Sequence, residues 1–366
     1  MEKTISIIKE KRNGEHRVIL TPREVKLFIN NGFRVLVECG AGENVGIPDT
    51  LFEEAGAQLV DTATAWNTSK LILKYKPPMD EEIEYLNEDK VLGAVFHAEG
   101  NPSLVNKLMH SGATAFTYEF FRTKEGVFPL SVASSEIAGR VAVIYGAYHL
   151  QRQLGGEGVL LAPVVNVQGP KVLVIGYGNA GGAAARLALA MGGRVTVLGT
   201  NREKLRAFQA TMPTEVQCLL NTPEVLEKEI TDADLVIGAI LISTYDTPPM
   251  VTEDLVRKMK KGSMIVDVTA GYGTGFLETF DHETTFKDPV YEKFGVLHCK
   301  IDVLPLAYPI TTVDAMSQHL APYLLKFAES VYNPSIEDVT SQAGKIVEFG
   351  KITHPEVLRH YEYGQS

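Results

Sequence analysis

The 366-residue chain has a formal net charge of −10, and 45% of its residues are hydrophobic while 22% are charged. This length is enough for two domains with cores of their own, and the composition is that of a globular protein. The negative charge argues against nucleic acid as a partner, because phosphate binding needs clustered lysines and arginines. No apolar run approaches the roughly 20 residues that span a bilayer, so we expect no membrane partner.

The three cysteines, Cys39, Cys218 and Cys299, form no C-x-x-C pair, and the N-terminus shows no signal-peptide pattern. These features predict a cytoplasmic protein without a disulfide framework. The histidines are not spaced as metal ligands, so we expect no metal site.

The first 130 residues alternate between apolar runs and helical patterns. Strands are expected at 3–9, 33–39, 59–60, 71–74, 90–96 and 113–116. Helices are expected at 102–110 and at 22–31, where Thr21, Pro22 and Glu24 form a helix start. This alternation is typical of a mostly parallel sheet that is covered on both faces.

Three polar residues of this first part are candidates for binding and catalysis. Lys76 and His97 follow predicted strands, and Arg17 precedes an apolar tripeptide. Ligands of open α/β sheets bind beyond the carboxyl ends of the strands. Arg17 and Lys76 together suit a substrate carboxylate, and His97 suits general acid/base catalysis. The alternatives are two solvated surface cations and a hydrogen-bonded core histidine.

A second set of alternating elements begins with a long helix, expected at 135–154 with a serine N-cap and an end at Gly155-Gly156. Strands are expected at 172–175, 194–198, 233–239, 263–268 and, as the last one, 296–301. Helices are expected at 183–191, 201–210, 250–259 and 311–332. The last helix is too long for a connection and should return to the first domain.

We therefore predict an α/β fold with two doubly wound, Rossmann-like domains. Residues 1–130 and 309–366 would form the substrate domain. Residues 131–308 would form a dinucleotide-binding domain that is inserted into it. We expect the cofactor and the substrate to approach each other from these two domains.

The strongest motif is a glycine turn between a buried strand and a helix. Gly176, Gly178 and Gly181 form G-x-G-x-x-G, with Asn179 and Ala180 inside the motif. Such a turn exposes backbone N–H groups and the positive end of the helix dipole, which suit a pyrophosphate. The alternative is a glycine turn of some other α/β protein.

The next strand ends without the acidic residue that binds the ribose hydroxyls in NAD-dependent domains. The position holds Gly199, followed by Thr200, Asn201 and Arg202. No carboxylate repels a 2′-phosphate here, and Arg202 offers a cation, so NADP(H) is favoured over NAD(H). The alternative is that Arg202 is a solvated residue in the first turn of the next helix.

At these residues the chain resembles the alanine dehydrogenase family, which is related to the nucleotide-binding subunit of transhydrogenase and to lysine-forming saccharopine dehydrogenase. The resemblance runs from residue 3 to about residue 335. Its most specific stretches are 9–22, 73–78, 135–140, 146–150 and the glycine turn.

The resemblance implies roles for single residues. Arg17 and Lys76 would bind the substrate carboxylate, and His97 would be the acid/base. Ser135 and the loop Ile240-Leu241 would contact the cofactor. Members of this family are often hexameric, so a homo-oligomer is expected.

Three positions depart from the family pattern. Gly271 stands where the family has an aspartate, Gly199 replaces the ribose-binding aspartate, and Asp302-Val303 replaces an Asn-Met pair. The stretch with Asp302-Val303 resembles saccharopine dehydrogenase more, and a glycine in place of an aspartate opens space and removes a charge. These features suit a substrate larger than alanine, or an imine made from an amine other than ammonia. Asp302 or Glu136 could supply the missing carboxylate.

The predicted function is that of a nicotinamide-dependent oxidoreductase that acts on the CH-NH bond of an amino acid and interconverts the amino acid with the imine of a 2-oxo acid. The main prediction is reduction of a 2-imino acid, or of a cyclic or secondary imine, to an amino acid other than alanine or to a secondary amine of opine or saccharopine type. The runner-up is alanine dehydrogenase, which converts pyruvate and ammonia to alanine. The pattern also leaves open a cofactor-sensing protein without catalysis and a transhydrogenase subunit.

Overall fold

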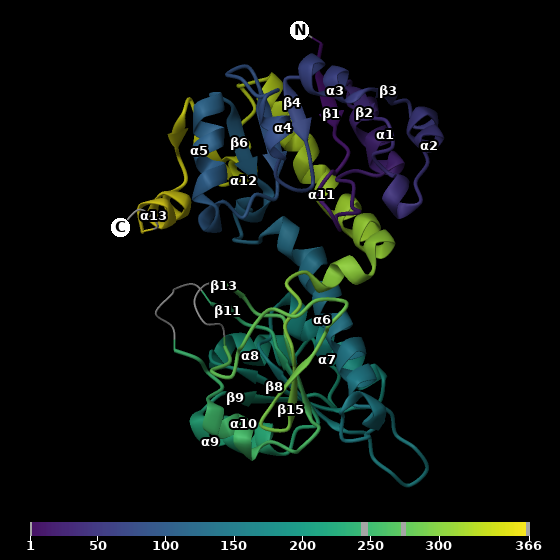
Figure 1. Ribbon diagram of the computed structural model, residues 1–366, viewed down its shortest axis with the longest axis vertical. Coiled ribbons are helices and arrows are strands. Elements are labelled where there is room, and N and C mark those ends of the chain that lie inside the picture. The colour runs from purple at the N-terminus through teal and green to yellow at the C-terminus, as the bar shows by residue number, and fades with distance from the viewer. Residues whose placement is uncertain (1, 243–247, 272–275, 364–366) are drawn as a thin grey trace. The chain divides into compact units, whose positions relative to one another are not determined.

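The computed structural model describes residues 2–242, 248–271 and 276–363 (Figure 1). The chain divides into two compact units, of which unit 1 comprises residues 1–133 and 308–366 and unit 2 comprises residues 134–307. Each unit has its own mostly parallel sheet, so the chain has the predicted α/β fold, with one Rossmann-like domain inserted into another. The sequence placed the two boundaries at 130/131 and 308/309.

Unit 1 contains an eight-stranded sheet in the order β17-β16-β6-β5-β4-β1-β2-β3. Its parallel strands are β1 (Thr4–Ile7), β2 (Arg34–Glu38), β3 (Gln58–Val60), β4 (Leu71–Leu73), β5 (Val91–Ala94) and β6 (Thr114–Thr117). The strand order reverses between β1 and β4, which pair directly through Ile5 and Leu71. Ligands of doubly wound sheets bind beyond the carboxyl ends of the strands at this reversal.

The last two strands of this sheet come from the C-terminal segment. The strand β16 (Lys345–Glu348) pairs antiparallel with β6, and β17 (Lys351–Ile352) pairs with β16. The expectation that 296–301 is the last strand is therefore wrong. A strand of four residues gives little periodicity, but Ile346 and Val347 are fully buried, because β16 lies between β6 and β17 and both side chains pack in an apolar cluster.

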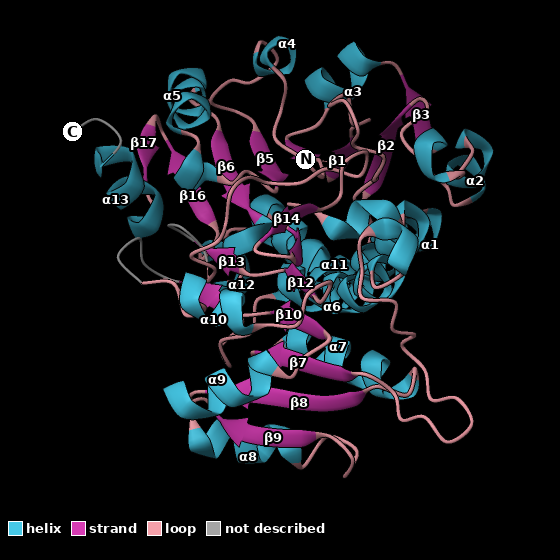
Figure 2. Cartoon of the chain, turned by 60° about the horizontal axis from the view of Figure 1, so that its bottom comes forward, coloured by secondary structure: helices cyan, strands magenta, loops and turns pink. Residues whose placement is uncertain are grey.

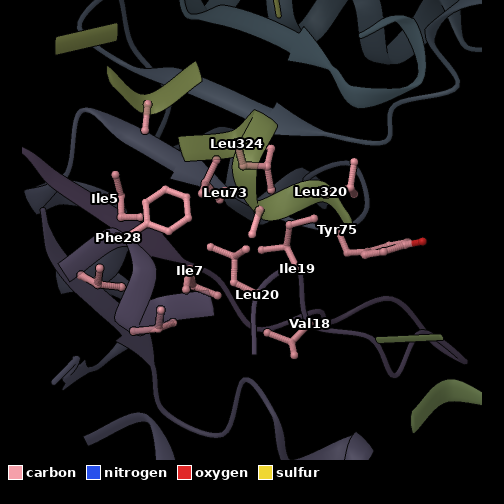
Figure 3. Close-up of a cluster of buried hydrophobic side chains, with 14 of the residues drawn as sticks. Ile5, Ile7, Val18, Ile19, Leu20, Phe28, Leu73, Tyr75, Leu320 and Leu324 are labelled. Carbon is pink, nitrogen blue, oxygen red and sulfur yellow. The ribbon is translucent and has the colours of Figure 1, made fainter. Parts of the chain in front are cut away.

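Helices cover the sheet of unit 1. They are α1 (Pro22–Asn30), α2 (Asp49–Glu54), α3 (Thr62–Thr68), α4 (Asp80–Ile83), α5 (Pro102–Ser111), α11 (Pro309–Tyr332), α12 (Val339–Gln342) and α13 (Pro355–Tyr363). The return of a long helix to the first unit is as expected, since α11 packs on α1 and buries Leu320 and Leu324 in its core (Figure 3). The Thr21 side chain bonds to the Glu24 carboxylate and does not cap α1 through a backbone N–H.

Unit 2 contains a seven-stranded sheet in the order β14-β15-β12-β10-β7-β8-β9. Its strands are β7 (Lys171–Ile175), β8 (Arg194–Gly199), β9 (Gln217–Leu220), β10 (Leu235–Gly238), β12 (Met264–Asp267), β14 (Tyr291–Lys293) and β15 (Val296–Cys299). Figure 2 shows β7, β8 and β9 side by side. Among these strands only β14 runs antiparallel to its neighbour. The strand order again reverses beside the first strand of the unit, between β7 and β10.

The helices of unit 2 are α7 (Asn179–Ala190), α8 (Arg202–Gln209), α9 (Pro223–Thr231) and α10 (Glu253–Lys258). The helix α6 (Pro129–His149) leads into the unit and begins earlier than the expected residue 135. Proline at the first position starts this helix, so Ser134 and Ser135 lie inside it and neither is its N-cap. Within the described residues, no helix combines the length and apolar character that crossing a membrane requires.

Candidate active site

His97 lies between a cation and a carboxylate at the carboxyl edge of the unit 1 sheet. Lys76 follows β4, His97 follows β5, and Glu119 follows β6 in the short 3-10 helix η3 (Tyr118–Phe120). The Nε2 atom of His97 is 3.0 Å from Nζ of Lys76, and its Nδ1 atom is 2.8 Å from Oε1 of Glu119. The fold thus brings together two of the three predicted catalytic residues.

The partners of His97 determine where its proton lies. A carboxylate can only accept a hydrogen bond, so Nδ1 of His97 carries the hydrogen that faces Glu119. An ammonium group can only donate, so Nε2 presents its lone pair to Lys76. In this arrangement Nε2 is the atom that can accept a proton, and Lys76 is within reach to supply one.

Glu119 also fixes the backbone beneath His97. Its Oε2 atom accepts hydrogen bonds from the backbone N–H groups of Phe96 and His97, both at 2.9 Å, and from the Thr117 hydroxyl at 2.6 Å. His97 has a left-handed φ of 46°, which costs energy in a residue other than glycine. Burial acts to raise the pKa of Glu119, but the hydrogen bonds from His97 and Thr117 outweigh it and lower the pKa.

Sequence reasoning missed Glu119. It directly follows β6, which is the neighbour of β5 in the sheet, so it belongs to the same edge as His97. A search for acidic residues after each predicted strand would have found it.

Arg17, the third predicted residue, is 2% exposed and is held by Glu15. Its Nε atom donates to Oε1 of Glu15 at 2.7 Å, and one terminal nitrogen donates to Oε2 at 2.6 Å. The other terminal nitrogen donates to the Tyr75 hydroxyl at 2.9 Å. A guanidinium has five N–H donors, so these three bonds use only part of its hydrogen-bonding capacity.

Tyr75 connects this ion pair with the residue next to it, Lys76. Its ring lies in the apolar cluster of unit 1 beside Ile19, and its hydroxyl points away from that cluster (Figure 3). The Arg17 guanidinium lies 3.9 Å from the centre of the ring. Burial acts to raise the pKa of Glu15, but hydrogen bonds and the charge of Arg17, with a further effect of Lys76, lower it. Glu15 therefore stays ionised beside both cations.

A buried charge cluster lies under the segment that carries Lys76. Oε1 of Glu10 accepts the backbone N–H groups of Tyr75 at 2.6 Å and Lys76 at 3.2 Å. The Nζ atom of Lys74 is 3.5 Å from Oε2 of Glu10 and 3.2 Å from Oε1 of Glu82. Glu10 thus holds the backbone at Lys76, and Lys74 offsets part of the cost of burying two carboxylates.

The buried Glu10 makes the stability of unit 1 depend on pH. Burial raises the pKa of Glu10 from 4.5 to about 7, although Lys74 and the two backbone N–H groups act to lower it. The folded state therefore holds this proton more tightly than the unfolded chain does. The free energy of unfolding should fall as the pH rises from about 4.5 to about 7, by about 3 kcal/mol in total.

The variant Glu10→Gln should remove this loss, because an amide keeps an acceptor for the backbone and does not titrate. Urea unfolding at several pH values, followed by fluorescence of Trp66, reports unit 1 because Trp66 is the chain's one tryptophan and is fully buried there. The exposed Glu53→Gln is the matched control and should keep the wild-type pH dependence. A Glu10→Gln variant that still loses stability over this range would contradict the assignment.

The described part of the chain holds one grouping of side chains that could take a metal ion. It consists of His97, Glu99 and Glu119, whose ligand atoms lie within 4.8 Å of one another. His97 and Glu119 already form the hydrogen bond described above.

The glycine turn of unit 2 fits a dinucleotide. Gly176 has a left-handed φ of 113°, and a Cβ there would lie 2.2 Å from the carbonyl oxygen of Ala239. A Cβ on Gly181 would lie 2.1 Å from the carbonyl oxygen of Gly176, so this glycine permits close packing of α7. A Cβ on Gly178 would meet nothing within 4 Å. This open space at the N-terminus of α7, where Asn179 and Ala180 begin the helix, suits a pyrophosphate.

The other predicted cofactor contacts are Ile240, Leu241 and Ser135. The side chain of Ile240, after β10, would be 3.2 Å from a Cβ on Gly176, and Leu241 beside it is 75% exposed. The helix α6 packs tightly on α7, since a Cβ on Gly139 would be 2.0 Å from the carbonyl oxygen of Ala180. Ser135 is half-buried and lies one helical turn before Gly139, on the same face of α6.

Gly199 is the last residue of β8, and the residues predicted to favour NADP(H) follow it. Thr200, Asn201 and Arg202 are exposed. The side-chain oxygen of Asn201 accepts the backbone N–H of Lys204 at 2.9 Å, so it caps α8. Arg202 is the first residue of that helix, as the alternative interpretation also expected.

Comparison with known proteins places the chain in a family. The model of the alanine dehydrogenase/PNT N-terminal domain matches residues 6–138, and that of the alanine dehydrogenase/PNT C-terminal domain matches residues 142–355. The chain belongs to the alanine dehydrogenase/PNT family. The predicted family is thereby confirmed, and so is the predicted class of enzyme, an oxidoreductase that uses a nicotinamide cofactor.

Relatives of this family align along nearly the whole chain. An alanine dehydrogenase of Bacillus subtilis is 38% identical, covering 98% of this chain and 95% of the relative. One of Methanococcus maripaludis is 35% identical, covering 98% and 96%. A solved structure of L-alanine dehydrogenase superposes with a TM-score of 0.90 at 33% identity, covering 98% and 99%. A transhydrogenase structure from Sinorhizobium meliloti gives a TM-score of 0.78 at 25% identity, covering 96% and 99%.

The positions that depart from the alanine dehydrogenase pattern lie at the carboxyl edge of unit 2. Gly271 belongs to the short strand β13 (Ala270–Gly271), which pairs with β11 (Leu241–Ile242). Asp302 is exposed just after β15. Glu136 is exposed and forms a 2.6 Å ion pair with Arg140 on the same helix. Of the two suggested replacement carboxylates, Glu136 thus already has a cationic partner.

Sequence reasoning also missed a buried ion pair at this edge. Asp267 ends β12 and is 2% exposed, and Nζ of Lys300 is 3.3 Å from its Oδ2 atom and 2.8 Å from the carbonyl oxygen of Thr269. Burial raises the pKa of Asp267, although Lys300 and Thr269 act to lower it. The pair anchors the segment that leads to Gly271.

Proposed function

We propose that the enzyme interconverts a small L-amino acid with its 2-oxo acid and ammonia, and that alanine and pyruvate are its first candidate substrates. The observation that carries the proposal is the arrangement of His97 between Lys76 and Glu119, with Arg17 held beside Tyr75 in the same unit. Full-length similarity to proteins named alanine dehydrogenase supports this choice of substrate over the main prediction from the sequence.

In the proposed mechanism, Arg17 and Lys76 bind the substrate carboxylate. Arg17 does so with the N–H groups that Glu15 and Tyr75 leave, and Lys76 with its charge. His97 accepts the proton that the substrate amine or carbinolamine releases, at Nε2, and returns it in the reverse direction. Glu119 keeps Nδ1 protonated throughout, so only Nε2 exchanges a proton.

The nicotinamide cofactor would accept or donate the hydride. Gly176, Gly178, Asn179, Ala180 and Gly181 are proposed to hold its pyrophosphate, with further contacts from Ser135, Ile240 and Leu241. We also propose a preference for NADP(H), because Gly199 offers no carboxylate to bind ribose hydroxyls or to repel a 2′-phosphate. Thr200, Asn201 and the Arg202 cation would then line the phosphate.

A second candidate is reduction of an imine formed from a 2-oxo acid and an amine larger than ammonia. It is favoured by Gly271, which stands where the resemblance to the alanine dehydrogenase family implies an aspartate, and by Asp302, which is exposed shortly after β15. A glycine removes both the charge and the volume of the aspartate, and so leaves space for a substituent on nitrogen.

We further propose a homo-oligomer in which the segment 158–168 takes part in the contact. This segment exposes Leu160, Val164, Val165 and Val167, with Val165 at 84% exposure. Exposed apolar patches of this kind are typical of protein–protein contacts. Light scattering of the purified enzyme measures the assembly.

The experiment that tests the proposed reaction is a substrate panel. Oxidation of NADPH and NADH should be followed with pyruvate and larger 2-oxo acids, each with ammonia or with an amino acid as the amine donor. Turnover of pyruvate with ammonia supports the first candidate. Turnover that requires an amino acid as donor supports the second. Nucleotide binding without turnover of any pair would contradict both candidate reactions and would favour a cofactor-sensing protein. Hydride exchange between two nucleotides would instead favour a transhydrogenase subunit.

A further inference from the structure

The ring of Tyr177 fills the space beside Gly199 in unit 2. Tyr177 lies inside the glycine turn, between Gly176 and Gly178, and is half-buried. A Cβ on Gly199 would lie 2.3 Å from Cε1 and 2.4 Å from Cδ1 of this ring, and 2.9 Å from Cδ1 of Leu205. Carbon atoms in contact lie about 3.5–4.0 Å apart, so no side chain fits at position 199 while the ring stays in place.

The backbone of Gly199 does not itself require glycine. Its φ is not in the left-handed region, and it continues β8 in register with Leu220 of β9. Its carbonyl oxygen also accepts the backbone N–H of Asn221 at 2.9 Å. The backbone position is thus fixed by the sheet, and any residue could adopt it. The absence of a side chain follows from packing against Tyr177.

The Tyr177 ring is in turn supported from the side of α8. The centre of the Phe208 ring lies 5.9 Å from that of Tyr177, at an interplanar angle of 43°. Phe208 also lies close to α7, since its Cε2 atom would be 3.2 Å from a Cβ on Gly182. The atoms that approach Gly199 are Cδ1 and Cε1, one edge of the Tyr177 ring, and Phe208 packs against the same ring.

We propose that Tyr177 and Gly199 form a single determinant of cofactor choice, in which the tyrosine ring stands where related domains carry a carboxylate. The proposal rests on the proposed function only in that the glycine turn binds a nicotinamide dinucleotide. The Tyr177 ring carries no formal charge, so it does not bind the ribose hydroxyls as a carboxylate does, and it does not repel a 2′-phosphate. The residue that sets the cofactor preference is therefore Tyr177 of the glycine turn, which precedes position 199, where related domains carry the carboxylate.

The test compares Gly199→Asp, Tyr177→Gly and the double variant with the wild type. Dissociation constants for NADH and NADPH are measured by the fluorescence of the reduced nucleotides, and thermal unfolding of the cofactor-free protein is followed by circular dichroism. Gly199→Asp alone should lower the unfolding temperature and leave the ratio of the two constants within about threefold of wild type. The double variant should regain the lost stability and shift the ratio toward NADH by about tenfold or more, because its carboxylate has space to bind the ribose.

The variant Tyr177→Phe combined with Gly199→Asp is the matched control, because it keeps the ring and should behave like Gly199→Asp alone. The proposal is overturned if Gly199→Asp alone shifts the ratio as far as the double variant does, or if the phenylalanine and glycine backgrounds give the same ratio. These measurements need no amino-acid substrate, so failure of the proposed reaction leaves them unaffected. A wild-type protein that binds NADH more tightly than NADPH would refute the proposed NADP(H) preference. The proposal that Tyr177 and Gly199 act together would still be decided by whether the effect of Gly199→Asp depends on residue 177.

Discussion

Replacing His97 by asparagine is expected to lower kcat by about 10²- to 10⁴-fold, the usual contribution of a positioned acid/base group. The imidazole of His97 has its Nδ1 atom 2.8 Å from Glu119 and its Nε2 atom 3.0 Å from Lys76, so removing it takes away the atom that exchanges the proton. Steady-state kinetics in both directions measure the loss.

Asparagine is the appropriate replacement because of the backbone at this position. His97 has a φ of 46°, a region that asparagine tolerates better than alanine does. Its side chain is 55% exposed, so the change should alter the free energy of unfolding by less than about 1 kcal/mol. An unchanged unfolding curve then excludes misfolding as the cause of the lost activity.

Glu119→Gln separates orientation from proton transfer. An amide at position 119 no longer requires the hydrogen on Nδ1 of His97, so both forms of the neutral ring become possible. We expect a smaller loss of kcat than in His97→Asn, because the imidazole that exchanges the proton is still present. A His97→Asn enzyme that keeps at least a third of the wild-type kcat would remove His97 from the acid/base role.

Replacing Arg17 by glutamine is expected to destabilise unit 1 by about 3–5 kcal/mol, because it leaves the buried carboxylate of Glu15 without its cation. Both side chains are almost fully buried, at 2% and 3% exposure, and their pair has an N–O distance of 2.6 Å. Arg17→Gln also removes a donor to the Tyr75 hydroxyl, which is itself buried. Urea unfolding followed by Trp66 fluorescence measures the loss in this unit.

The double variant Glu15→Gln with Arg17→Gln is the control, since it removes both charges together and should regain most of the lost stability. The same variant isolates the effect on binding. Its KM for the 2-oxo acid should rise by about 10- to 100-fold, the equivalent of about 1.5–3 kcal/mol for a lost charged hydrogen bond. An Arg17→Gln variant as stable as the wild type would contradict the role of Arg17 in the buried ion pair. A double variant with an unchanged KM would contradict its role in binding the substrate carboxylate.

The fold was largely predictable because its elements have strong local signals. The glycine turn, the buried strand β7 before it and the Pro22 start of α1 follow from residue types at fixed spacings. The errors occurred where the local signal was weak. The strand β16 is recognised only through its pairing with β6, and α6 begins at Pro129 although serines farther along offered a more familiar N-cap.

The candidate site was predictable in its charges and not in its contacts. Arg17, Lys76 and His97 stood out by residue type and by their places near strand ends. Glu15, Glu119 and Glu10 did not, because a carboxylate that the fold buries is indistinguishable in the sequence from a solvated one. For Glu10 and Glu119 the importance comes from contacts between residues that are far apart in the chain, such as Glu10 and Lys76.

Residue patterns alone were enough to indicate the fold class, the insertion of one domain into another and a dinucleotide cofactor, because these depend on local periodicity and motif spacing. The family was indicated by the resemblance of specific stretches to known proteins. The folded chain was needed to learn which way His97 holds its proton, that Arg17 already shares its guanidinium with Glu15, and why position 199 is a glycine. Each of these is a matter of packing and burial. Tyr177 shows the difference most directly, since nothing in its neighbours along the chain indicates that its ring excludes a side chain 22 positions later.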